Sequence, residues 1–173
     1  MIATDIETIF NSGVGLSYNT VLRGGAEEPF YQAPTAAKPQ ATIWYRSDYV
    51  RSALHELAHW CVAGPERRLR DDYGYWYAPD GRTPEQQRLF FQVEVHPQAI
   101  ERLFCEALEI PFEVSVDNLN AVGSEHDIKH FDAEVERLAG HMSLSGLGER
   151  ARCLLMSLQA FHTRSTHKIL HVC

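Results

Sequence analysis

Five consecutive residues, His55-Glu56-Leu57-Ala58-His59, carry the side chains in this sequence that are best suited to chemistry. In an α-helix, residues i and i+4 lie one turn apart on the same face, so both imidazoles can reach a single ion. Neutral imidazole is the commonest metal ligand in proteins, and two imidazoles with a carboxylate suit zinc or non-heme iron. The sequence therefore predicts a metal site that includes His55 and His59.

The flanking residues predict that this motif lies on a buried helix. Ser47 and Asp48 can cap its start, and Gly64-Pro65 can end it. Residues 49–62, which lie between these signals, contain no Gly or Pro. The helix has an apolar stripe, and the neighbours of the two histidines are small or apolar, as expected of a buried helix. Buried imidazoles need partners, which are a metal ion or, in the alternative, backbone carbonyls.

A third ligand is expected from another part of the chain, and Glu94 is the first candidate. On a helix that begins at Pro84 and continues past Pro97, Glu94 shares a stripe with apolar residues. A carboxylate in such a place is costly unless it binds a metal or is neutralised by an arginine. The alternative ligands are His96 and Glu101. His96 is the weaker of the two, because a residue before proline is pushed away from helical geometry.

Two further groups of residues have types that could bind a ligand. His126 and His130 also stand at i and i+4, but charged residues flank them, which indicates a solvated face. The aromatic segment 73–77 can line a pocket for an aliphatic or cationic side chain, or can alternate as an ordinary strand with one face in the core. We take Tyr75 and Trp76, with Arg82 after the turn, as candidate substrate-binding residues.

The elements that must position these residues predict an α+β fold in which helices predominate and the sheet is small. We expect one domain over residues 1–173, with a loose tail at 163–173. Residues 29–40 contain three prolines, Pro29, Pro34 and Pro39, and are predicted as a loop. Helices are predicted at 4–11, 49–62, 84–108, after Ser124 through Met142, and at 149–161; strands are predicted within 13–25 and at 41–45, 73–77 and 112–116.

Composition and charge exclude several classes of protein. The hydrophobic fraction of 45% is typical of a globular protein, and the formal net charge of −7 argues against binding to a nucleic-acid backbone. The basic cluster at 66–70 is a local exception, best explained as a solvated helix end or loop. No apolar run reaches membrane-spanning length, and residues 1–10 do not resemble a signal peptide. The four scattered cysteines indicate reduced thiols and a cytoplasmic location.

Longer motifs around the metal site resemble those of the bacterial elongation factor P hydroxylase family. The stretches that carry the resemblance are 53–61, 74–82 and 93–99, with shorter matches at Asn19-Thr20, 24–26, Glu28-Pro29 and 116–119. The similarity runs from about Asn19 to Asn120; the C-terminal third is similar only in helical character. The resemblance implies an iron-dependent monooxygenase that uses dioxygen to hydroxylate the modified lysine of elongation factor P. It implies His55, His59 and Glu94 as Fe(II) ligands, with Glu56 orienting a ligand or a bound water.

Two alternatives remain open at this point. A zinc peptidase would use the same three ligands with Glu56 as the general base, and the motif alone favours it. In either enzyme we expect the metal-binding helix to be placed as in the zincins; in a peptidase, the strand at 41–45 before it can hold an extended peptide. A non-catalytic protein with a structural metal would need four protein ligands, and the cysteines are poorly spaced for that.

Overall fold

Helices dominate the fold, and a small sheet lies at one side of them. The computed structural model describes residues 2–47, 49–72, 82–116 and 125–170. These ranges confirm the predicted α+β class, rich in helix with a small sheet. The elements are α1 (Ala3–Ser12), α2 (Val14–Ser17), β1 (Thr20–Ala26), β2 (Phe30–Gln32), β3 (Ala41–Arg46), α3 (Val50–Val62), the short 3-10 helix η1 (Arg67–Leu69), α4 (Pro84–Ala107), α5 (Glu125–Ser145) and α6 (Glu149–Leu170).

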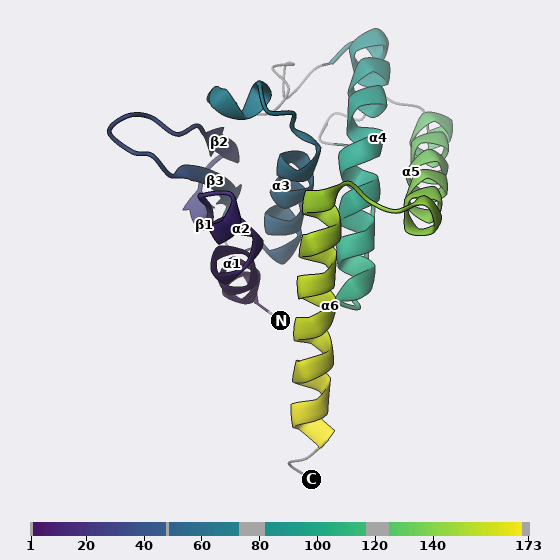
Figure 1. Cartoon of the computed structure of the whole chain (residues 1–173). Helices are drawn as coiled ribbons and strands as arrows, with labels where there is room; N and C mark the ends of the chain where they lie inside the picture. The colour runs from purple at the N-terminus through teal and green to yellow at the C-terminus, as the bar shows by residue number, and fades with distance from the viewer. Residues whose placement is uncertain (1, 48, 73–81, 117–124, 171–173) are drawn as a thin grey trace.

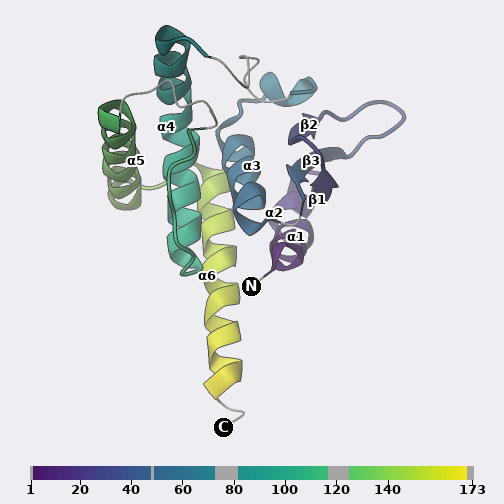
Figure 2. The same cartoon turned by 180° about the vertical axis from the view of Figure 1, so that it is seen from behind.

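The elements stack from the sheet outward, with α3 in the middle. Figures 1 and 2 show α3 between the sheet and α4, while α5 packs on the far side of α4. Helix α6 runs beside these helices, contacts α1, α3 and α4, and extends beyond them at its C-terminal end. One apolar core joins the layers; it includes Phe10, Ile43, Leu54, Leu57, Phe104 and Leu158, which are at most 2% exposed. The metal-binding motif therefore lies on the central helix of the molecule.

Strand β3 is the centre of the sheet and leads directly into α3, as the sequence predicts. It pairs in parallel with β1 and antiparallel with β2, so that Ile43 lies opposite Leu22 on one side and Tyr31 on the other. Most residues of β3 are buried, which fits a strand with neighbours on both sides. A single bridge from Tyr31 to Asp72 continues the pairing beyond β2.

Side chains from α1 occupy the outer edge of β1. The Asn11 side chain accepts from the Leu22 N–H (2.7 Å) and donates to the Leu22 carbonyl (3.0 Å), as a neighbouring strand would. Glu7 accepts from the Gly24 N–H (2.8 Å) and from the Tyr45 hydroxyl (2.9 Å). A Cβ at Gly24 would lie only 2.7 Å from the Tyr45 ring, so this close approach requires glycine.

Helix α4 begins where the sequence predicts. The Thr83 hydroxyl accepts from the Gln86 N–H (3.3 Å), and the Gln86 side chain accepts from the Thr83 N–H (2.9 Å), which completes a reciprocal cap. Pro84 occupies the first helical position, and the helix continues through Pro97 to Ala107. Glu94 is therefore part of a regular helix that packs against α3.

Four expectations about the elements differ from the structure. Residues 30–32, predicted as loop, form β2, because the prolines lie outside these three residues and Phe30 stacks on Trp44 (centroids 5.9 Å apart). Residues 112–116 alternate in burial like a strand, but their partners are side chains of α3 and α4, and they form no strand. Helix α3 starts at Val50 with Tyr49 as its cap, and neither the cap nor Ser47, whose φ is 51°, supplies a capping side chain.

The predicted tail at 163–173 is also different, because α6 continues to Leu170. No Gly or Pro interrupts residues 163–170, and the Thr163 and Thr166 hydroxyls donate to carbonyls of the preceding turn. The strand predicted at 73–77 and the helix cap predicted at Ser124 lie outside the described residues. Within the described ranges, no helix combines the length and apolar character needed to cross a lipid bilayer.

Candidate metal centre

Helices α3 and α4 bring together the three side chains that the sequence predicts as metal ligands. His55 and His59 come from successive turns of α3, and Glu94 comes from the middle of α4. One ligand atom of each lies within 4.8 Å of the other two. Glu94 is 2% exposed, whereas the two histidines are half-buried. The carboxylate thus lies at the buried end of the cluster, and the two imidazoles lie at the end that solvent can reach.

The separations between these atoms fit a single metal ion. The Nε2 atoms of His55 and His59 are 3.0 Å apart, and Glu94 Oε1 lies 3.3 Å from His59 Nε2. The other oxygen of Glu94 lies 3.7 Å from His55 Nε2. Two donors bound at about 2.1 Å lie about 3.0 Å apart at a right angle and about 3.4 Å apart at the tetrahedral angle. Two imidazole nitrogens and a carboxylate group at these separations form a donor set that suits both zinc and non-heme iron.

The electrostatics of the cluster favour a positive charge between the histidines. Burial alone would raise the pKa of Glu94, but the charge and hydrogen bond of His59, with the charge of His55, lower it to about 2. Burial alone would lower the pKa of His55, but the hydrogen bond and charge of Glu101, with the charge of Glu94, raise it to about 10. A proton or a metal cation satisfies this preference, because either one compensates the buried carboxylates.

Glu101 holds His55 from the side opposite Glu94. Its Oε2 accepts from His55 Nδ1 (2.8 Å), and its Oε1 accepts from Arg51 Nε (3.2 Å) and NH2 (2.8 Å). The carboxylate is 1% exposed. With Nδ1 directed at Glu101, Nε2 faces Glu94 and His59, where either a second proton or a metal ion can be held. Glu101, expected as an alternative ligand, thus orients His55, which belongs to the three-residue cluster.

Gln98 orients Glu94, as Glu101 orients His55. Its amide nitrogen donates to Glu94 Oε2 (3.3 Å) and to the Ser115 carbonyl (2.8 Å), while its oxygen accepts from the Ser115 N–H (2.9 Å). Gln98 is completely buried one turn after Glu94 on α4. The carboxylate is therefore held by a side chain that is itself fixed to the backbone.

Glu56, which stands between the two histidines in the sequence, is half-buried. It interacts electrostatically with both histidines and with Glu94. Burial raises the pKa of its carboxyl group, and the charges of His55 and His59 oppose that rise. Glu56 is not part of the three-residue cluster. A carboxyl group in this place can hold or orient a proton beside the ligands.

Other residues singled out in the sequence lie elsewhere. His96 is exposed, and so are His126 and His130 on α5, which confirms that their face is solvated. Arg82 is 1% exposed, and its guanidinium lies 4.2 Å above the Phe90 ring, one helical turn before Glu94. Tyr75 and Trp76 lie outside the described residues, so the role of all three substrate-binding candidates stays a prediction.

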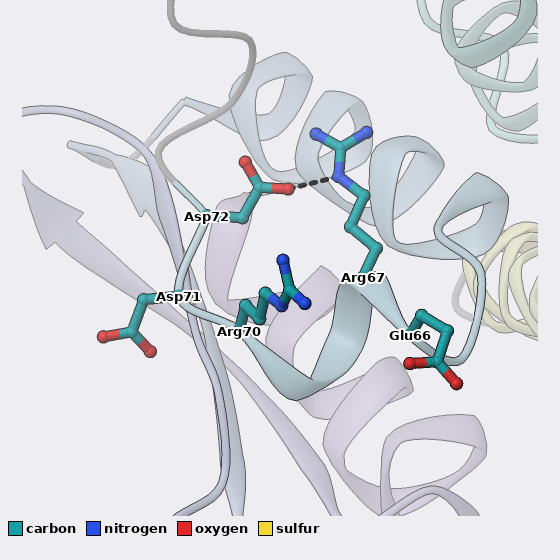
Figure 3. Close-up of a pocket in the computed structure, with 5 residues that line it drawn as sticks. All are labelled: Glu66, Arg67, Arg70, Asp71 and Asp72. Atoms are coloured by element: carbon teal, nitrogen blue, oxygen red, sulfur yellow. Dashed lines mark hydrogen bonds and ion pairs between the residues drawn. The ribbon is translucent and has the colours of Figure 1, made fainter.

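A charged surface pocket lies beyond the C-terminal end of α3. It is lined by Glu66, Arg67, Arg70, Asp71 and Asp72, and Arg67 pairs with Asp72 across it (Figure 3). The neighbouring Arg68 donates to the Ala63 carbonyl (2.6 Å). The basic cluster of the sequence is thus compensated locally by acids and carbonyls, as expected of a solvated helix end.

The sequence did not assign the roles of Arg51, Gln98 and Glu101, although it contains signals for them. Glu94, Gln98 and Glu101 recur at helical spacing, so three polar residues share the side of α4 that packs on α3. Arg51 precedes His55 by one turn and lies on the same side of α3. Buried polar residues that face a pair of histidines therefore indicate side chains that hydrogen-bond to the candidate ligands and orient them.

The family model described as EpmC, elongation factor P hydroxylase, matches residues 9–171. The protein named elongation factor P lysine hydroxylase from Haemophilus influenzae is 42% identical to this chain over 159 residues. That match covers 92% of this chain and 88% of the relative, so it includes both metal-bearing helices and the segment after α4.

Proposed function

Since this chain belongs to the elongation factor P hydroxylase family, we propose that it hydroxylates the modified lysine of elongation factor P with an iron ion held by His55, His59 and Glu94. The observation that carries the proposal is the cluster of two imidazoles and one buried carboxylate at metal-ligand separations. Iron bound by such a set, together with dioxygen, supplies the oxidation of an unactivated C–H bond. The partners are then dioxygen and a translation factor, and we expect the reaction in the cytoplasm.

The side chains of the cluster have distinct tasks in this proposal. His55, His59 and Glu94 would hold the ion, and three protein ligands of this kind suit an ion that also binds small molecules. Glu101 keeps the proton of His55 on Nδ1, so that Nε2 is available as a ligand. Glu56 orients a ligand or a water at the open side, because its carboxyl group lies near both histidines without belonging to the cluster.

The substrate side chain sets a further requirement. A modified lysine is long and cationic, and aromatic faces and apolar walls suit such a group. We propose that Tyr75, Trp76 and Arg82 contact it. The zinc-peptidase alternative used the same ligands, but membership of a hydroxylase family gives it no support.

The test is a reconstitution with a defined substrate. The protein is loaded anaerobically with Fe(II), mixed with lysylated elongation factor P and a two-electron reductant, and exposed to oxygen; the reductant supplies the electrons that convert the second oxygen atom to water. We expect a mass gain of one oxygen on the modified lysine, seen by peptide mass spectrometry. His55→Ala and Glu94→Ala should lose both the iron and the mass gain, while the control His126→Ala, on an exposed face, should keep both.

Two results would overturn the proposal. One is the absence of the mass gain from protein that is folded and loaded with iron. The other is a preference for zinc together with a peptide cleavage that Glu56→Gln abolishes, which would restore the peptidase alternative.

A further inference from the structure

Two hydrogen-bonded relays lead away from the metal ligands and end on the same stretch of backbone. That stretch is the extended segment 111–116, which follows α4 and runs back along it (Figure 2). It forms no strand, yet its backbone is held at Glu113 and at Ser115 by side chains from α3 and α4. The two relays begin at different candidate ligands, His55 and Glu94, but both end on the backbone of segment 111–116. This shared end point suggests that the segment helps to hold the ligands.

The first relay starts at His55. Its Nδ1 donates to Glu101, Glu101 accepts from Arg51, and Arg51 NH2 donates onward to the Glu113 carbonyl (2.6 Å). The Arg51 guanidinium also lies 5.0 Å from the centre of the Phe112 ring. Both oxygens of Glu101 are used in this chain of contacts, one by His55 and one by Arg51. Glu101 is therefore kept from becoming a fourth ligand.

The second relay starts at Glu94 and is shorter. Gln98 donates to Glu94 Oε2 and binds Ser115 through both ends of its amide, with distances of 2.8 and 2.9 Å to the backbone. An amide that is committed to one backbone residue in this way has no freedom to rotate. The position of Glu94 is thereby tied to the position of Ser115.

We propose that Arg51, Glu101 and Gln98 are positioning residues for the metal ligands, and that segment 111–116 is the anchor that they share. Metal binding and the holding of this segment are then coupled, and by linkage each strengthens the other. Partners behind a ligand fix its orientation, and their loss typically weakens metal binding by about 10-fold to 100-fold. The inference rests on the ligand set of the proposed function, but not on the identity of the metal or of the substrate.

The test measures metal affinity without turnover. Cobalt(II), whose visible spectrum reports the geometry of its ligands, is titrated into the protein and into Glu101→Ala and Gln98→Ala. We expect both variants to bind about 10-fold to 100-fold more weakly, with an altered cobalt spectrum. Glu101→Gln, which keeps an oxygen facing His55, should recover part of the affinity.

Matched controls lie on the same helix. Glu106→Ala removes an exposed acid that pairs with Arg102, and Gln92→Ala removes an exposed glutamine. Both should keep the affinity and the cobalt spectrum of the unmodified protein. Unchanged affinity and spectrum in both Glu101→Ala and Gln98→Ala would refute the positioning roles.

A second measurement needs no substitution. Hydrogen exchange at the Ser115 N–H, which donates to Gln98, should slow when cobalt binds. An exchange rate that is the same with and without the metal would refute the coupling, even if a variant failed to fold. Retention of cobalt by His55→Ala would instead disprove the proposed ligand set, so the two failures are distinguishable.

Discussion

At the scale of single residues, His55 is fixed through both of its nitrogens. Nδ1 binds Glu101 at 2.8 Å, and Nε2 faces Glu94 and His59 at 3.7 and 3.0 Å. An imidazole held in this way has one tautomer and one ring orientation available for a metal. Order at the site therefore depends on groups that do not themselves touch the ion.

Glu56 provides a prediction at this scale. Glu56→Gln should keep one metal ion per chain, because Glu56 is not part of the cluster of ligands. Hydroxylation should fall by about 10-fold to 100-fold, since the carboxylate that orients a ligand or water has lost its charge. Metal analysis and mass spectrometry of the substrate measure the two quantities separately. Loss of the metal from this variant would place Glu56 among the ligands.

The sequence predicted the cluster of ligands because local spacing carries that information. The i, i+4 histidines must share a helix face, and an acid on the apolar stripe of another helix must have a partner. The role of Glu101 was not predictable in this way, because it depends on how two helices align residues 46 positions apart. Glu94 and Glu101 are both buried acids on one side of α4, and only the packing of α3 distinguishes the ligand from its support.

At the scale of elements, helix α1 completes the sheet with side chains in place of a strand. Asn11 presents an oxygen and an amide nitrogen to Leu22 at the spacing of a peptide group. This leaves less of the β1 edge open to pairing with another chain, which is a common hazard of exposed strands. The side chains of α1 thus protect the sheet that leads into the metal-bearing helix.

Removal of this contact should destabilise the protein. Asn11→Ala leaves the N–H and the carbonyl of Leu22 without the Asn11 partner, at an expected cost of about 1–3 kcal/mol in the free energy of unfolding. Asn11→Asp keeps the acceptor and loses the donor, so its free energy of unfolding should lie between those of Asn11→Ala and the unmodified protein. Urea unfolding followed by circular dichroism gives the comparison. Equal stability of Asn11→Ala and the unmodified protein would contradict a structural role for this contact.

Elements with strong local signals were predicted well, and those defined by distant partners were not. The reciprocal cap of Thr83 and Gln86 marked the start of α4 correctly. Residues 112–116 have the alternation of a strand, but the element beside them is a helix, which the alternation does not reveal. Helix α6 continues nine residues beyond the predicted end at 161, because residues 162–170 contain no Gly or Pro that would end it.

At the scale of the whole molecule, Arg150 connects the last helix to the metal-bearing helix. It comes from the first turn of α6, and its NH2 donates to the carbonyls of Cys61 (3.0 Å) and Ala63. Its guanidinium lies 4.7 Å from the centre of the Trp60 ring. A cation at the C-terminal end of a helix satisfies carbonyls that have no partner within the helix. The end of α3 next to His59 is therefore completed by a distant part of the chain.

The corresponding prediction concerns stability more than metal binding. Arg150→Met should lower the free energy of unfolding by about 1–3 kcal/mol, because carbonyls at the end of α3 lose a charged donor. Its cobalt affinity should change less than that of Glu101→Ala, since Arg150 contacts no ligand side chain directly. Thermal unfolding and cobalt titration test the two parts. The exposed neighbour Arg152 gives the control Arg152→Met, which should behave like the unmodified protein.

The position of Arg150 also orders events during synthesis. Arg150 follows Cys61 by 89 residues, so at ribosomal rates of about 5–20 residues per second it is made on the order of 10 s after α3. During that interval the nascent helix carries both histidines but lacks the donor for its final carbonyls, and for part of it Glu94 is absent as well. The last turn of α3 consequently receives its charged donor only after all three candidate metal ligands have been made.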